Sequence, residues 1–228
     1  MRTFLNLLKW DLVLLAKYGI LPVAIGIGLL YIVLIYLLNI PSDIIILLIF
    51  SDPSMMGFIF VGVMILFEKQ AGTTSAIIVT PLQPWQYLLS KSTSLSIPAV
   101  IVSAAMALAS NVPVNYLFLI VAIVLTSILF LLLGFVGVQR VKTFNQYILI
   151  IPMFLAPLCI PIVEFFGLWE TPLMWIIPTH ASLELLKAAY NEVKLWKIFL
   201  SHLVLLTSIL LAWKWAIVEY RKRMAEHN

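Results

Sequence analysis

Six long runs of apolar residues dominate this 228-residue sequence and restrict what it can fold into. A helix that crosses the hydrocarbon of a lipid bilayer needs about 20 apolar residues. The runs cover residues 19–38, 53–67, 92–110, 116–138, 144–163 and 198–218. With 63% hydrophobic and 11% charged residues, a water-soluble fold of this size would be unable to cover its apolar surface. We therefore expect an all-α integral membrane protein with six transmembrane helices, forming one domain over residues 1–228.

The second run is shorter than the others and short for a full crossing. The sequence Ser51-Asp52-Pro53 is typical of a helix start, with a side-chain cap followed by proline at the first helical position. The preceding apolar stretch, residues 44–50, is too short to span a bilayer. Two interpretations stay open: an interfacial or re-entrant piece, or the first part of a kinked helix that begins at Ile44.

The Lys and Arg residues are distributed unevenly between the connecting segments. If the N-terminus is cytoplasmic, ten of them fall in inner segments, namely Arg2, Lys9, Lys17, Lys69, Lys91, Arg140, Lys142, Arg221, Lys222 and Arg223. Three fall outside, all in one loop: Lys187, Lys194 and Lys197. Cytoplasmic loops of membrane proteins carry the excess of Lys and Arg. We therefore expect a multi-pass protein of the plasma membrane with both termini in the cytoplasm.

Residues 1–18 have the character of an amphipathic helix. Arg2, Asn6, Lys9 and Lys17 fall near one helical face, and Trp10 with several leucines covers much of the rest. This pattern predicts an elbow helix that lies along the inner leaflet and contacts membrane lipid. The alternative is a cytoplasmic extension of the first span.

The longest outer connection, residues 164–197, follows a fifth run that contains Pro152, Pro157 and Pro161 and is therefore not one straight helix. Within the connection, Thr179 is a candidate cap for a short helix over residues 180–190. We expect one or two short helices in the outer leaflet. A plain extracellular loop is the alternative.

The spans offer little chemistry of their own. Lys214 and His202 lie near the ends of the last run, and no chain of buried carboxylates is present, which disfavours a proton- or sodium-coupled carrier. His180 and Glu184 are one turn apart, a spacing that is more often a surface contact than a metal site. The sequence also has no phosphate-binding G-x-x-x-x-G-K motif. We expect no enzyme activity, no metal, no directly bound cofactor and no nucleic-acid partner; if ATP drives this protein, another subunit must bind it.

The first inner loop, residues 68–91, carries the most specific pattern. Gly72 permits a sharp change of direction, and Thr73 or Thr74 can cap a short helix that ends near Val79. That helix presents Ile77 and Ile78 to an apolar surface, and two prolines, Pro81 and Pro84, end it and stiffen the return.

This loop resembles that of the permease subunits of ATP-binding-cassette transporters of the type-2 exporter family. Those subunits show an acidic-basic pair, Gly-Thr, a short amphipathic helix, a Thr-Pro-Leu turn and a lysine that opens the third span. The positions that match are Glu68, Lys69, Gly72, Thr73, Thr80, Pro81, Leu82, Tyr87 and Lys91. Gln70 departs from the pattern, because an acidic residue is common there.

The resemblance implies a cytoplasmic coupling helix that sits in a cleft of an ATPase subunit. The partners it implies are two cytoplasmic ATPase subunits, which bind ATP and Mg, and a second permease copy or homologue. The residues implied in ATPase coupling are Glu68, Lys69, Gly72, Thr73, Ala76, Ile77, Ile78, Thr80, Pro81 and Lys91. Glu68 is a candidate to pair with Lys69, with Lys91 or with basic residues of the elbow helix. The alternative is that Glu68 is a solvated charge at a helix end.

The resemblance also implies a substrate path between two permease copies, lined by the first, second and fifth spans. The candidate lining residues in those spans are Met55, Met56, Phe58, Phe60, Met153 and Phe154. Their soft apolar side chains favour a hydrophobic drug, antibiotic or peptide as cargo, moved outward by alternating access. The alternatives are a permease for haem or lipid-linked glycans, or a membrane anchor that transports nothing.

Overall fold

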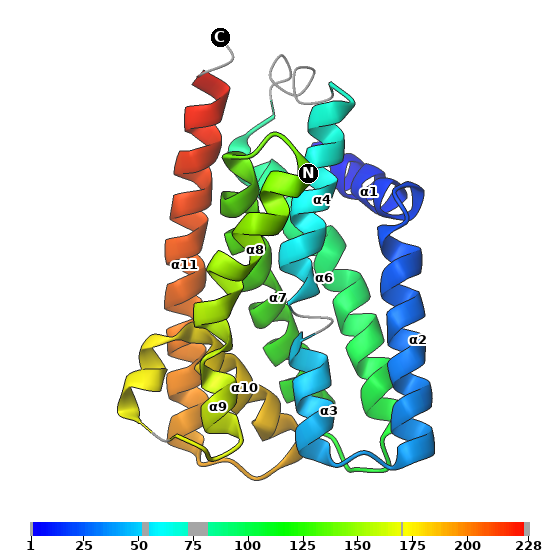
Figure 1. The fold of residues 1–228 in the computed structure, drawn as a ribbon, viewed down its shortest axis with the longest axis vertical. Coiled ribbons are helices and arrows are strands. Elements are labelled where there is room, and N and C mark those ends of the chain that lie inside the picture. Colours follow the sequence, from blue (N-terminus) through cyan, green and yellow to red (C-terminus); the bar gives the residue numbers. More distant parts are fainter. Residues whose placement is uncertain (1, 52–54, 73–81, 170, 226–228) are drawn as a thin grey trace.

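The computed structural model describes residues 2–51, 55–72, 82–169 and 171–225, and every regular element among them is a helix. Figure 1 shows a bundle of long helices with α1 lying across one end. The elements are α1 (Arg2–Lys17), α2 (Ile20–Leu38), α3 (Ser42–Ile49), α4 (Met56–Gln70), α6 (Pro84–Ala109), α7 (Tyr116–Gln139), α8 (Phe144–Cys159), α9 (Pro161–Phe165), the 3-10 helix η2 (Pro172–Ile176), α10 (Pro178–Tyr190) and α11 (Leu195–Ala225).

Within these residues, five helical segments are long and apolar enough to cross a membrane. They are Ile20–Leu38, Pro84–Ala109, Tyr116–Gln139, Phe144–Phe165 and Leu195–Lys222. The expected all-helical membrane class is therefore confirmed. The remaining run, residues 53–67, corresponds to α4, and most of the preceding stretch 44–50 forms α3; the two helices follow one another along the bundle (Figure 1). The predicted helix start at Pro53 lies outside the described residues.

The two ends of the bundle differ. One end, here named the terminus end, carries α1, the last turns of α11 and the segments that end α4 and begin α6 (Figure 1). The opposite end carries α9, η2 and α10. The expected helix over the first residues is present as α1, and the long outer connection contains short helices as expected.

Helix α7 lies at the centre of the bundle and packs against α4, α6, α10 and α11. Glycine brings α4 and α7 into close contact, since a Cβ at Gly134 would lie 2.4 Å from the backbone oxygen of Phe58. On α4, a Cβ at Gly62 would lie 2.1 Å from the ring of Tyr147, whose hydroxyl donates to the same Phe58 oxygen at 2.5 Å. Membrane helices use small residues in this way because lipid supplies no hydrophobic force between them.

Two predicted helix starts are wrong. Pro84 begins α6, where Gln83 and Gln86 cap each other's backbone, so this helix starts eight residues before the apolar run that begins at Ser92; the short helix that Pro84 was expected to end lies outside the described residues. At the opposite end, α10 begins at Pro178, and the hydroxyl of Thr179 donates to the backbone oxygen of Leu158 at 2.6 Å instead of capping. Proline at the first helical position explains both starts, because it needs no hydrogen-bond partner there. The expected break in the fifth run is confirmed, since α8 ends at Cys159 and α9 begins at Pro161.

Candidate functional site

Three charged side chains from three helices meet inside the terminus end of the bundle. The ammonium group of Lys91 on α6 lies 2.6 Å from Oδ1 of Asp11 on α1 and also contacts Oε1 of Glu68 on α4. Only 2%, 2% and 4% of Lys91, Asp11 and Glu68 is exposed to solvent. We name these residues, together with Tyr87 and Ser90, the charged joint.

Every carboxylate oxygen of the charged joint has a hydrogen-bond donor. Ser90 Oγ donates to Oδ2 of Asp11 at 2.5 Å, and the Tyr87 hydroxyl donates to Oε2 of Glu68 at 2.5 Å. A buried ion pair offsets its desolvation cost only when the remaining lone pairs are satisfied in this way. The charged joint therefore fixes the relative positions of α1, α4 and α6.

The charges of the joint are not balanced, because two carboxylates share one ammonium group. Burial raises the pKa of Asp11 above its usual value, and the nearby ammonium group of Lys91 opposes this shift. Burial therefore favours the protonated form of Asp11.

Aromatic contacts connect the joint to two further helices. Tyr87 stacks on Tyr220 of α11 with ring centroids 5.4 Å apart, and it meets Phe135 of α7 edge-on at 6.1 Å. Such pairs stabilise by about 0.5–1.5 kcal/mol beyond their buried area. Tyr87 therefore connects the joint to α7 and α11.

Lys69 and Arg140 hold the terminus end of α7. Lys69 Nζ donates to the backbone oxygens of Val138 and Val141 at 2.9 and 3.1 Å, which binds the end of α4 to the end of α7. A cation at this position is favourable because it meets the negative end of the helix dipole. Arg140 Nε lies 2.9 Å from Oε1 of Glu219, which joins α7 to α11.

The described residues include four of the ten predicted ATPase-coupling residues. Glu68, Lys69 and Lys91 lie in or beside the joint, and Gly72 follows with a left-handed backbone (φ 68°). The other six lie outside the described residues: Thr73, Ala76, Ile77, Ile78, Thr80 and Pro81.

Of the partners expected for Glu68, the structure shows Lys91, and its burial contradicts a solvated charge. The contribution of α1 is the acid Asp11, a residue that sequence reasoning missed. An available signal was that Asp11 is the only acidic residue among residues 1–42.

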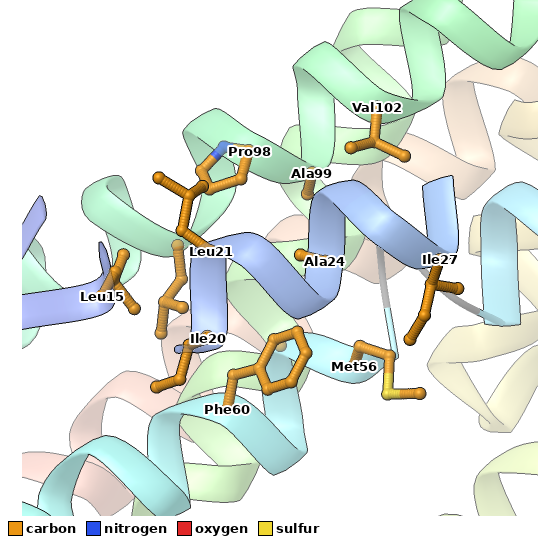
Figure 2. Close-up of a pocket in the computed structure, with 12 residues that line it drawn as sticks. Leu15, Ile20, Leu21, Ala24, Ile27, Met56, Phe60, Pro98, Ala99 and Val102 are labelled. Carbon is orange, nitrogen blue, oxygen red and sulfur yellow. The ribbon is translucent and has the colours of Figure 1, made fainter. Parts of the chain in front are cut away.

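The six candidate path residues occupy different environments. Met56 and Phe60 line a small apolar pocket between α1, α2, α4 and α6, and Figure 2 shows both side chains facing α2. Phe58 is buried against Tyr147 and Phe154. Met55 is half-buried just before α4, and Phe154 stacks on Trp215. Met153 lies on α8 with 76% of its surface exposed.

The pocket in Figure 2 has a volume of about 30 Å³, whereas sites for drug-sized ligands have about 300–1,000 Å³. Leu15, Ala24 and Pro98 are among its other lining residues. In this conformation the pocket is too small for a drug.

At the opposite end, His180 and Glu184 lie one turn apart on α10, and each has a charged partner elsewhere. His180 Nδ1 lies 3.4 Å from Oε2 of Glu164, whereas Glu184 pairs with Lys187 and Lys197. Burial lowers the pKa of His180. The described residues contain no group of three side chains suited to a metal ion.

Comparison with known proteins gives a consistent family assignment. The model of the Fluoroquinolones export permease protein family matches residues 2–226. Two proteins named fluoroquinolones export permease protein, from the CDC 1551 / Oshkosh and H37Rv strains of Mycobacterium tuberculosis, are each 37% identical over 155 residues. The match covers 65% of this chain and 64% of each relative, slightly less than two thirds of their length. The chain belongs to the fluoroquinolones export permease protein family.

Proposed function

We propose that the chain is the membrane-spanning subunit of an ATP-driven exporter that moves a hydrophobic drug out of the cell. The relatives are named for fluoroquinolone export, so a fluoroquinolone is the first candidate substrate. The apolar character of the spans supports a hydrophobic cargo. Two partner ATPase subunits bind ATP and Mg, and a second permease copy or homologue completes the path.

The observation that carries this proposal is the charged joint. Glu68 and Lys91 flank the segment that is the proposed coupling helix, and they contact each other across its two ends. Asp11 adds the crosswise helix α1 to the same contact. A push from an ATPase on the intervening segment therefore displaces α1, α4 and α6 together, and the aromatic contacts of Tyr87 pass the displacement to α7 and α11.

The proposed topology has six crossings and both termini in the cytoplasm. In it, α3 and α4 together form the second crossing, broken between them, and α1 lies along the inner leaflet. Two features support this arrangement: α1 and the end of α11 lie at the same end of the bundle (Figure 1), and ten Lys and Arg residues gather in the segments assigned to that side.

The proposed path opens along α2 and α4, where Met56 and Phe60 lie. Helix α2 packs mainly on α6 and α1, so its separation from α4 breaks few contacts. Separation of α2 from α4 enlarges the pocket of Figure 2 into a cavity that holds the drug. Alternating access then releases the drug on the outer side.

Transport into inverted membrane vesicles tests the proposal. The chain is expressed with its ATPase, and ATP-dependent uptake of a fluoroquinolone is measured beside haem and a lipid-linked glycan as competing cargoes. We expect uptake of the fluoroquinolone and stimulation of ATP hydrolysis by it. Uptake of only haem or the glycan would favour those permeases, and ATP hydrolysis that no cargo stimulates would favour a membrane anchor.

A further inference from the structure

A long apolar groove runs between α6, α7 and α11, away from the pocket of Figure 2. Helices α6 and α11 each pack along α7 but make few contacts with each other, so α7 forms the floor of a gap between them. The floor residues Ile120, Val124 and Ile128 recur every fourth residue, and the groove has a volume of about 630 Å³. All three helices belong to segments long and apolar enough to cross a membrane, so the groove lies in the part of the bundle proposed to be in the membrane.

The dimensions of the groove select its occupant. Its lining on α6 extends from Leu89 to Ile101, about 18 Å at the rise of an α-helix. The volume then corresponds to a mean cross-section of about 35 Å², which is smaller than the section of a whole helix of about 10–12 Å diameter. None of the described residues that line the groove is charged. An extended hydrocarbon chain matches both the shape and the chemistry.

The terminus end of the groove offers a place for a phosphate group. Trp85 precedes the lining residue Leu89 by four residues, so it continues the groove-lining face of α6. Arg221 follows the lining residue Trp213 by eight residues, which places it two turns further along α11 and about 80° around that helix. Because Tyr220 stacks on Tyr87, the turns that carry Arg221 and Trp85 lie at the same level. Both side chains are exposed. Arginine binds phosphate well, and Trp is enriched at membrane interfaces.

We propose that the groove binds one acyl chain of an anionic phospholipid from the leaflet at the terminus end. Arg221 binds the phosphate and Trp85 lies at the interface beside it. The bound chain fills the gap between α6 and α11, which the protein's own side chains leave open. This site is separate from the proposed drug path and does not depend on export.

Photolabelling of the purified full-length chain in phosphatidylcholine nanodiscs tests the site. The probe is a phosphatidylglycerol with a diazirine in its acyl chain, and labelled peptides are identified by mass spectrometry. We expect labelling to concentrate on the groove-lining parts of α6, α7 and α11. Substituting Ile97→Trp fills the groove and reduces this labelling to the level of the exposed α8 surface. The same change on that surface, Ile148→Trp, leaves the groove labelling intact.

Competition by unlabelled lipids tests the headgroup. Phosphatidylglycerol is expected to compete better than phosphatidylcholine, and Arg221→Gln weakens its competition by about fivefold. Lys222→Gln, one residue further around the helix, leaves it unchanged. Equal labelling of α2, α8 and the groove would overturn the site, as would groove labelling that survives both Ile97→Trp and Val124→Phe in variants that remain monodisperse. Equal competition by the two lipids would overturn the role of Arg221.

Discussion

The ammonium nitrogen of Lys91 lies 2.6 Å from a carboxylate oxygen of Asp11, 80 residues earlier in the chain. This contact binds the crosswise helix α1 to the first turns of α6. It lies at the terminus end, beside the ends of the proposed coupling segment. Helix α1 packs mainly on α6 and α2. Through the Asp11–Lys91 ion pair it is also joined to the structure that, in the proposed function, an ATPase would move.

Replacement of Lys91 by Met is expected to destabilise the protein by about 3–5 kcal/mol, because two buried carboxylates lose their shared cation. Thermal unfolding in detergent, followed by circular dichroism, measures the effect. Asp11→Asn is the informative comparison, since it leaves one carboxylate for one ammonium group. We expect Asp11→Asn to destabilise much less than Lys91→Met; equal losses would contradict the charge argument.

Substituting Gly62→Ala is expected to destabilise by about 1–3 kcal/mol, because the new methyl group would overlap the ring of Tyr147. Gly26→Ala is the matched control. It is also a helix interior position, but no heavy atom lies within 4 Å of the added Cβ, so the higher helix propensity of alanine leaves stability unchanged or improved. The measurement compares the unfolding midpoints of the two variants in the same detergent. A Gly62→Ala protein as stable as the parent protein would contradict the close packing of α4 against Tyr147.

Stability is expected to fall as the pH decreases below about 6.5, through His180. The pKa of this residue is lowered in the folded protein, so in that range the unfolded chain binds a proton that the folded chain does not. Protonation therefore favours unfolding. The difference in unfolding midpoint between pH 7.5 and pH 5.5 measures the effect, and His180→Gln should reduce that difference.

Deletion of residues 74–79 is expected to leave the protein in the membrane while ATP hydrolysis no longer drives transport. The flanking joint residues Glu68 and Lys91 remain, so the bundle keeps its contacts. Gly72→Pro should act similarly, because proline does not adopt the left-handed backbone found there. Vesicle uptake and ATP hydrolysis measured on the same preparation test this, and unchanged uptake after the deletion would exclude a coupling role.

Most of the helices were predictable because hydrophobic length alone defines a membrane span. The first, fourth and fifth runs agree closely with α2, α7 and the α8–α9 segment. The start of α6 was missed because Pro84 was interpreted as a helix end, although proline is equally suited to a first turn. Hydropathy predicts the apolar part of α6 as a membrane helix. It does not predict the first turns of α6, because the residues around Ser90 and Lys91 are polar.

The charged joint was predictable only in part. Glu68 and Lys91 stood out because the loop pattern contains both, and their pairing was one of several alternatives. Asp11 was not predicted because the sequence of α1 indicates an amphipathic helix with a basic face. Helical periodicity also does not show which distant helix will bury a given side chain. The two tyrosine contacts, Tyr87 with Tyr220 and Tyr147 with the backbone of Phe58, join residues far apart in sequence and required the structure.

The glycine contact between α4 and α7 has a consequence for inhibition. Gly134 packs directly against the backbone of Phe58, so α4 and α7 are closely joined, whereas α2 packs mainly on α6 and α1 and makes few contacts with α4. If the proposed path opens between α2 and α4, a rigid apolar compound bound beside Met56 and Phe60 would hold these helices at one separation and inhibit export.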